Sequence, residues 1–540
     1  MISIFSLDRI EVGEYTYQRL IWLSKCRKRG PLSLIEKYLE SSIESKCQLV
    51  VLFFKTSYLP ITEVAEKTGL TFLQINHYCE ELNAFFPDSL SMTIQKRMIS
   101  CQFTHPFKET YLYQLYASSN VLQLLAFLIK NGSHSRPLTD FARSHFLSNS
   151  SAYRMREALI PLLRNFELKL SKNKIVGEEY RIRYLIALLY SKFGIKVYDL
   201  TQQDKNTIHS FLSHSSTHLK TSPWLSESFS FYDILLALSW KRHQFSVTIP
   251  QTRIFQQLKK LFIYDSLKKS SRDIIETYCQ LNFSAGDLDY LYLIYITANN
   301  SFASLQWTPE HIRQCCQLFE ENDTFRLLLN PIITLLPNLK EQKASLVKAL
   351  MFFSKSFLFN LQHFIPETNL FVSPYYKGNQ KLYTSLKLIV EEWMAKLPGK
   401  RYLNHKHFHL FCHYVEQILR NIQPPLVVVF VSSNFINAHL LTDSFPRYFS
   451  DKSIDFHSYY LLQDNVYQIP DLKPDLVITH SQLIPFVQHE LTKGIAVAEI
   501  SFDESILSIQ ELIYQVKEEK FQADLTKQLT YAPCHYMARL

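Results

Sequence analysis

Two stretches near the start of the chain repeat one pattern of apolar and polar positions. The first reads PITEVAEKTGLT at residues 60–71, and the second reads PLTDFARSHFLS at residues 137–148. In each, a proline precedes apolar residues at helical spacing, and a threonine or serine that can cap a further helix stands at the end. Each stretch therefore predicts a short helix, a tight turn and a longer helix, the order of a helix–turn–helix unit. The alternative is an ordinary helical hairpin in a protein core, and the presence of two copies makes this interpretation the weaker one.

The longer helix of each unit is expected to enter the major groove of DNA. Thr71 and Gln74 have the spacing of a capping box, which marks the start of the first such helix. The predicted inward residues are Ile75, Tyr78, Cys79 and Leu82 in the first helix and Ala152, Met155, Leu159 and Leu162 in the second. The predicted DNA contacts are Thr71, Phe72, Gln74, Asn76 and His77 in the first unit and Asn149, Ser150, Tyr153, Arg154 and Arg156 in the second.

Each of these helices is followed by an alternating segment, at residues 91–99 and 167–175, that predicts the β-hairpin of a winged helix. Basic residues on such a wing would hold phosphates without reading sequence. The candidates are Lys96 and Arg97 in the first wing and Lys169, Lys172 and Lys174 in the second. Because arginine pairs with guanine through two hydrogen bonds, Arg154 and Arg156 favour the second unit for base recognition.

The second copy departs from the pattern at two positions. Phe146 stands where the first copy has the turn glycine Gly69, so the second turn is expected to differ in detail. Pro161 lies inside the predicted second helix and should kink it or end it there, because proline has no amide hydrogen to donate.

Beyond these units the chain predicts a mainly α, multidomain protein. Helix follows helix to about residue 423, and the apolar run at 426–431 then predicts a buried parallel strand. Further strands are expected at 454–462, 475–479 and 494–500, with helices near 435–445, 484–491 and 506–518, as in a small open α/β domain. The predicted organisation is an N-terminal extension (1–35), two winged helix–turn–helix units (36–105 and 106–178), two helical bundles (179–298 and 299–423), an α/β domain (424–525) and a tail (526–540).

Composition narrows the function. The chain has 540 residues, a formal net charge of +9 and only 10 glycines, and we find no glycine-rich phosphate loop. No catalytic spacing is evident, and we expect no cofactor. The 9 cysteines lack CxxC spacing and are typical of reduced cytoplasmic thiols that fill a core. No apolar run is long enough to span a bilayer, and the N-terminal segment does not read as a signal peptide, so a cytoplasmic protein without a membrane partner is expected.

The segments LSNSSAYR at residues 147–154 and IVGEEYRIRY at residues 175–184, with the order of predicted domains, resemble the Mga family of transcription regulators of Gram-positive pathogens. Within it the chain looks most similar to the RofA-like (RofA/Nra) branch. The resemblance implies that the bundles are similar to phosphotransferase-system regulatory domains (PRDs) and that the α/β domain is similar to an EIIB component of sugar transport. The loop Ser432-Ser433-Asn434 has no cysteine, unlike the EIIB enzymes, which argues against phosphoryl transfer through it.

The family also implies that a phosphocarrier protein phosphorylates PRD histidines. His209 is the first candidate, because family members tend to carry a regulatory histidine early in the first bundle. The other candidates are His214, His218 and His243 in the first bundle and His405, His409 and His413 in the second. The last three follow one helical face, which could ligate zinc, but no metal is predicted. A surface histidine without a role is the alternative for each.

The leading hypothesis is therefore a homodimeric, sequence-specific regulator that binds double-stranded promoter DNA. By resemblance, it would activate or repress genes for surface adhesins, pili and virulence. A second hypothesis is an adaptor whose helix–turn–helix units bind protein. A third, a phosphotransfer or metal-dependent enzyme, would need convergent catalytic groups that the sequence does not display.

Overall fold

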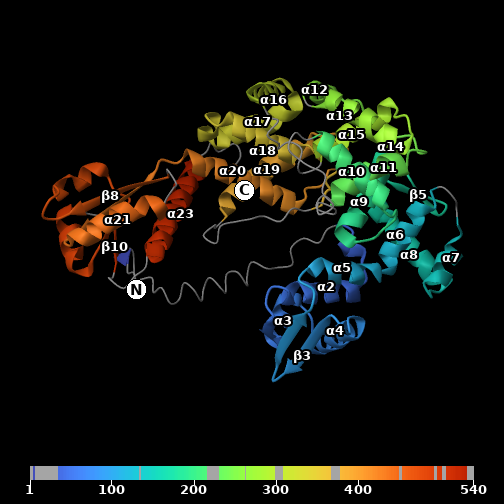
Figure 1. Cartoon of the computed structure of the whole chain (residues 1–540), viewed down its shortest axis with the longest axis horizontal. Coiled ribbons are helices and arrows are strands. Elements are labelled where there is room, and N and C mark those ends of the chain that lie inside the picture. The colour runs from blue at the N-terminus through green and yellow to red at the C-terminus, as the bar shows by residue number, and fades with distance from the viewer. Residues whose placement is uncertain are drawn as a thin grey trace.

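A computed structural model describes residues 4–5, 34–132, 136–215, 230–261, 263–297, 308–366, 378–399, 401–448, 453–491, 495–500 and 506–531. Helices dominate these residues, and a small sheet lies near the C-terminal end of the chain. In Figure 1 the sheet occupies one end of the long axis and the helix α7 (Leu138–Ser144) lies near the other, with the helical bundles between them. The prediction of a mainly helical chain with a C-terminal parallel sheet is confirmed.

The first helix–turn–helix unit is a winged helix. Its elements are α2 (Ser41–Phe53), β2 (Tyr58–Pro60), α3 (Ile61–Thr68), α4 (Phe72–Phe85), β3 (Leu90–Gln95) and β4 (Met98–Phe103), after a short η1 (Glu36–Tyr38). The three strands form an antiparallel sheet in the order β2-β4-β3. Gly69 ends α3 in the left-handed conformation, with φ of 73°.

The second unit repeats this order with a smaller sheet. It comprises α5 (Lys108–Ala117), α6 (Asn120–Lys130), α7, α8 (Asn149–Asn165), β5 (Lys169–Ser171) and β6 (Lys174–Val176). Of the two outcomes expected at Pro161, a kink or an end of the helix, the end is wrong, since α8 continues to Asn165. Leu159, Leu162 and Leu163 are all buried, so packing on both sides of the proline holds the last turn in place.

Two helical bundles follow. The first contains α9 (Glu179–Phe193), α10 (Gln202–Ser215), α11 (Ser230–Lys241), α12 (Arg253–Leu261), α13 (Tyr264–Ser270), the π-helical η3 (Ser271–Glu276), α14 (Thr277–Cys279) and α15 (Ala285–Thr297). The second contains α16 (Pro309–Glu321), α17 (Asp323–Leu335), η4 (Pro337–Lys340), α18 (Lys343–Ser354), α19 (Gln380–Ala395) and α20 (His405–Ile422). One continuous hydrophobic core joins both bundles to both winged units. The predicted division at residues 299–309 lies mostly outside the described residues.

The C-terminal sheet has the order β1-β10-β9-β7-β8. Strands β7 (Leu426–Ser432), β8 (Ile454–Tyr460), β9 (Leu476–Thr479) and β10 (Ala496–Glu499) are parallel, and β1 (Ile4–Phe5) pairs antiparallel with β10. Alternate residues of β7 contribute to two cores, one on each face of the sheet, as its apolar run predicts. The connecting elements are α21 (Phe435–Tyr448), η5 (Val466–Leu472), η6 (Ser481–Leu483), α22 (Ile484–Phe486) and η7 (Val487–Leu491).

The last helix, α23 (Ile506–Tyr531), is shared between the sheet and the second bundle. Ile509 and Ile513 lie in a core of the sheet, whereas Phe521 and Leu525, further along the helix, lie in the core of the bundles. The helix therefore runs through the boundary predicted between residues 525 and 526. Figure 1 shows α23 between the sheet and the bundle helices.

A buried ion cluster lies where the second winged unit meets the first bundle. Glu179, in the first turn of α9, accepts a hydrogen bond from Nε of Arg183 at 3.0 Å and from Nε of Arg242 at 2.7 Å. Both arginine side chains are at most 2% exposed. Arg183 also donates to the backbone carbonyl of Arg242 at 3.1 Å, and its guanidinium group lies 4.5 Å from the centre of the Tyr290 ring. The single carboxylate thus balances two guanidinium groups removed from water.

No single helix in the described ranges is both long and apolar enough to cross a membrane. The pair α5 and α6, bent by 71°, passes that test together by length and composition only.

We predict that Glu179→Gln lowers the free energy of unfolding by about 3–5 kcal/mol, because it leaves two buried guanidinium groups without a counter-charge. Urea-induced unfolding followed by circular dichroism would measure the loss. Glu178→Gln, at the neighbouring exposed position, is the control and should change it by less than about 0.5 kcal/mol. Equal midpoints for the two variants would contradict the role given to Glu179.

Candidate nucleic-acid interface

The helix α4 starts with the capping box that the sequence predicts. The hydroxyl group of Thr71 accepts a hydrogen bond from the amide of Gln74 at 3.3 Å, and the side chain of Gln74 accepts one from the amide of Thr71 at 2.9 Å. Ile75, Cys79 and Leu82 are buried, as predicted, and Tyr78 is half-buried. The cap occupies the Gln74 carbonyl oxygen, so this side chain is only partly available for other contacts.

The exposed side of α4 begins with an apolar patch. Phe72 is 51% exposed and Leu73 is 81% exposed. Leu73 is not among the DNA contacts predicted from the sequence. Its position next to Phe72 at the start of the helix is the signal that could have indicated its exposure. Asn76 and His77 are also exposed, and the His77 ring lies 3.2 Å from the carboxylate of Glu81.

The first wing presents two positive charges at its tip. Gln95 pairs with Met98, so Lys96 and Arg97 form a two-residue hairpin turn, with φ of 47° and 65°. Positive φ at both central residues is what a tight hairpin of this length requires, although glycine or asparagine usually provides it. Both side chains are exposed. The amide of Ile61, the first residue of α3, donates to the carbonyl of Arg97 at 2.9 Å and fixes the wing to the helix–turn–helix.

The helix α8 starts at Ser148, whose hydroxyl group accepts a hydrogen bond from the amide of Ser151 at 3.1 Å. Its first turns expose Asn149, Ser150, Tyr153 and Arg154. The buried residues include Ala152, Leu159 and Leu162, as predicted, and Met155 is half-buried. The N-terminal end of α8 thus presents polar and aromatic groups to solvent, as a helix that enters the major groove would.

The outward position expected for Arg156 is wrong. Its side chain is 18% exposed, and its guanidinium group donates to the carbonyl of Lys172 in the wing turn at 2.7 Å. It also pairs with Glu157. The hairpin folds back over this side of the helix, which helical spacing alone does not reveal. Arg156 is therefore placed to hold the wing, whereas Arg154 faces solvent.

The second wing is shorter than the first. Lys169 and Lys172 are exposed, Lys174 is half-buried, and Lys172 has φ of 53°. The side chain of Asn131, at the end of α6, donates to the carbonyl of Asn173 at 2.9 Å. The turn is thus held both by α6 and by Arg156.

The end of α8 makes contacts that the sequence did not predict. The ring of Phe166 packs against that of Phe364 in the second bundle, with centroids 4.7 Å apart and the planes tilted by 36°. The next residue, Glu167, forms an ion pair with Arg181 at 2.5 Å and accepts a hydrogen bond from the Asn360 side chain. Arg181 in turn donates to the Asn360 carbonyl at 3.1 Å. These contacts join the end of α8 directly to the second bundle. The partners lie far apart along the chain, so no local sequence signal marks them.

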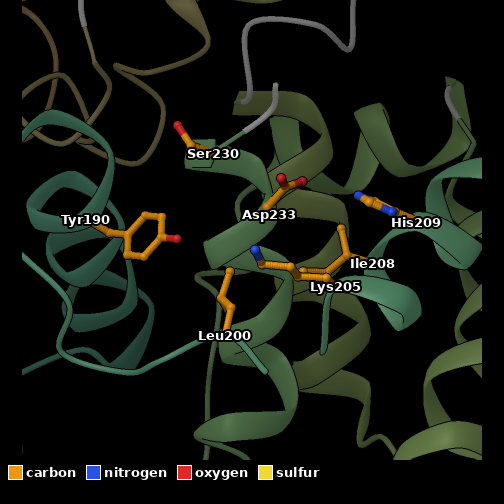
Figure 2. Close-up of a pocket in the computed structure, with 7 residues that line it drawn as sticks. All are labelled: Tyr190, Leu200, Lys205, Ile208, His209, Ser230 and Asp233. Atoms are coloured by element: carbon orange, nitrogen blue, oxygen red, sulfur yellow. The ribbon is translucent and has the colours of Figure 1, made fainter. Parts of the chain in front are cut away.

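His209 lies on α10 and lines a pocket in the first bundle. Figure 2 shows its ring and the carboxyl group of Asp233 on the same side of the pocket, with Lys205 nearby. Tyr190, Leu200, Ile208 and Ser230 complete the lining. His209 is half-buried, so one part of its ring is open to solvent.

The other candidate histidines have varied surroundings. His214 lies 3.0 Å from the Ser270 hydroxyl group, and His243 lies 3.8 Å from the carboxylate of Asp287. His218 lies outside the described residues. His405, His409 and His413 all belong to α20, and burial lowers the pKa of His413. The described ranges hold no group of three or more His, Cys, Asp or Glu residues placed to bind a metal ion.

Cys47, Cys79 and Cys101 are buried in the core, and the polar loop after β7 starts a helix. Burial raises the pKa of Cys47, Cys79 and Cys101 to about 12 each, which keeps these thiols protonated. After β7, the Asn434 side chain accepts a hydrogen bond from the amide of Ile436 at 3.0 Å and starts α21. The polar groups of this loop therefore serve a helix start.

We predict that Arg156→Ala speeds hydrogen exchange of the wing amides about tenfold, because a hydrogen bond from a charged group stabilises by about 1.5–3 kcal/mol. Exchange at residues 171–174, followed by mass spectrometry or NMR, would measure it. Arg154→Ala is the matched control and should leave this exchange unchanged. Equal protection in both variants would show that Arg156 does not hold the wing.

Two family models match the chain. The Mga helix-turn-helix domain matches residues 106–190, and the M protein trans-acting positive regulator (MGA) PRD domain matches residues 205–414. No curated protein matches it. The first range contains α7, α8 and the second wing, and the second range contains α10 to α19 and most of α20. The two ranges together cover more than half of the chain, and both describe parts of one kind of regulator. The chain therefore belongs to the Mga family and is a DNA-binding transcription regulator controlled through its PRD region.

Proposed function

We propose that this chain is a cytoplasmic, sequence-specific regulator of promoters that reads DNA mainly through α8 and grips it through its two wings. The observation that carries the proposal is the open N-terminal end of α8, where Asn149, Tyr153 and Arg154 are exposed together. Arginine and asparagine are the side chains best suited to guanine and adenine edges in the major groove. The N-terminal residues of a recognition helix are the ones that reach those edges.

The first unit would add affinity more than specificity. Lys96 and Arg97 carry two positive charges on a rigid hairpin tip, which suits contact with phosphates. The Gln74 side chain is engaged in the helix cap, and His77 lies beside Glu81, so fewer groups on α4 are available to read bases. Asn76 is the clearest candidate for a base contact in this unit.

Control through the bundles would act on the position of α8. The contacts of Phe166 and Glu167 with Phe364 and Asn360 connect the end of this helix to the second bundle. A change in the second bundle that moved Asn360 would therefore move the end of the reading helix. Two discrete arrangements of this junction would suffice to switch DNA affinity.

We further propose that phosphorylation of His209 by a phosphocarrier protein biases this switch, on the basis of family resemblance and the position of His209 at an open pocket. A phosphoryl group would bring nearly two negative charges close to Asp233 and Lys205. The Asp233 carboxylate would repel these charges, and the Lys205 ammonium group would attract them. The same resemblance supports a homodimer of the RofA-like branch that controls adhesin, pilus and virulence genes as activator or repressor.

We predict that Arg154→Ala weakens binding to specific promoters by about 5- to 150-fold, because it removes a paired contact with a base. Capture of sheared genomic DNA by the purified protein, read by sequencing, would first identify the promoters; titration of one of them would then give the affinity. Lys96→Ala with Arg97→Ala should instead weaken all DNA alike and reduce the salt slope by about two units. Uniform weak capture by the wild type and by Arg154→Ala would favour the adaptor hypothesis.

For the switch, we predict that His209→Asp and His209→Ala change transcription of a captured promoter in opposite directions. The aspartate adds negative charge at the pocket, as phosphorylation would, whereas the alanine prevents it. A reporter assay at matched protein levels would measure both, with His439→Ala, at an exposed histidine of α21, as the control. Identical outputs from the two His209 variants would rule out this site.

A further inference from the structure

Phe146 is the most exposed large apolar side chain in the described part of the chain. It is 98% exposed, in the turn between α7 and α8. Its neighbours point the other way. The His145 ring packs on Phe141, with centroids 4.3 Å apart, and Leu147 packs against the core. The turn therefore directs this one ring into solvent.

The backbone at Phe146 also has a cost. Its φ is 54°, in the left-handed region that Gly69 occupies in the first unit with φ of 73°. This conformation costs about 1–2 kcal/mol for a residue with a side chain and little for glycine. The turn itself is closed by main-chain groups, with the amide of Leu147 donating to the carbonyl of Ala142 at 2.8 Å. Glycine would make the same turn without strain. The structure therefore shows no contribution of the phenyl ring to the stability of the fold.

The ring of Phe146 lies close to the start of α8, the proposed DNA-reading helix. Phe146 is two residues before Ser148, which caps α8, so it lies within about 7 Å of the helix start along the chain. The start of a recognition helix is the part that enters the major groove. Two exposed arginines, Arg143 and Arg154, stand on either side of it in the sequence, and they suit an anionic surface.

We propose that Phe146 is a specificity-determining DNA contact whose ring packs against the 5-methyl group of a thymine at the edge of the site read by α8. Apolar contact with this methyl group is the means by which an aromatic side chain distinguishes thymine in the major groove. The contact with DNA would then compensate for the backbone strain, as expected for strained residues at functional sites. The proposal rests on the proposed role of α8 as the reading helix.

The test uses the full-length protein and a promoter duplex obtained by genomic capture. Phe146→Gly should raise the melting temperature, because it removes the strain, and should lower specific affinity about five- to tenfold. Its salt slope should stay unchanged, since no phosphate contact is lost. Phe146→Ala keeps the strain and should lose the same affinity, which separates the contact from the strain. Phe107→Ala, at a 68% exposed phenylalanine before α5, is the control and should bind normally.

Replacement of single thymines by deoxyuridine removes only the methyl group. One such position should weaken the wild type about five- to tenfold and leave Phe146→Gly unaffected. Equal sensitivity of both proteins at every thymine would overturn the proposal. Normal DNA binding by Phe146→Gly together with loss of transcription would also overturn it. That result would indicate that the ring contacts a protein partner instead of DNA. If Arg154→Ala and the Phe146 variants all bind normally, the proposal that α8 reads DNA is overturned. If only the Phe146 variants bind normally, the proposed thymine contact is overturned and the role of α8 stands.

Discussion

The carboxylate of Glu179, held between the guanidinium groups of Arg183 and Arg242, fixes the point at which the DNA-binding part meets the bundles. Without it, two buried guanidinium groups would lack a counter-charge in a medium of low dielectric, and the packing of α9 against the end of α11 would be destabilised. The next polar residue of the same helix, Arg181, reaches back to Glu167 and across to Asn360. One turn of α9 therefore orients the second winged unit against both bundles.

This arrangement limits how a signal can reach DNA. The second wing ends at Val176 and α9 begins at Glu179, so no flexible linker separates the reading helix from the bundles. The sheet is tied in as well, because Arg420 of α20 donates to Glu518 of α23 at 2.9 Å and α23 enters both cores. Packed interiors of this kind change between discrete arrangements more readily than they deform. A modification in either bundle would thus act by exchanging one set of junction contacts for another.

The sequence predicts what depends on local chemistry. The capped helix starts at Thr71 and Ser148 and the buried strand at 426–431 follow from caps and from the spacing of apolar residues, and the structure contains each of them. It does not predict contacts between residues distant along the chain. The wing carbonyl that binds Arg156 and the docking of Phe166 on Phe364 both require the tertiary fold. Helical spacing predicts which residues of α8 face solvent; the exposure of Arg154 agrees with this prediction, whereas that of Arg156 does not, because the hairpin covers it.

Three residues with an unfavourable backbone conformation lie at the proposed DNA surface. Lys96, Arg97 and Phe146 all adopt positive φ without glycine, two at the tip of a wing and one before the reading helix. Each position would be easier to fold with glycine or asparagine, so folding stability does not explain the side chains present. A charged pair at a wing tip and an apolar ring beside a groove-reading helix are instead the two kinds of contact that DNA offers, with phosphates and with base edges. At these three positions the local strain therefore lies where recognition of DNA can compensate for it.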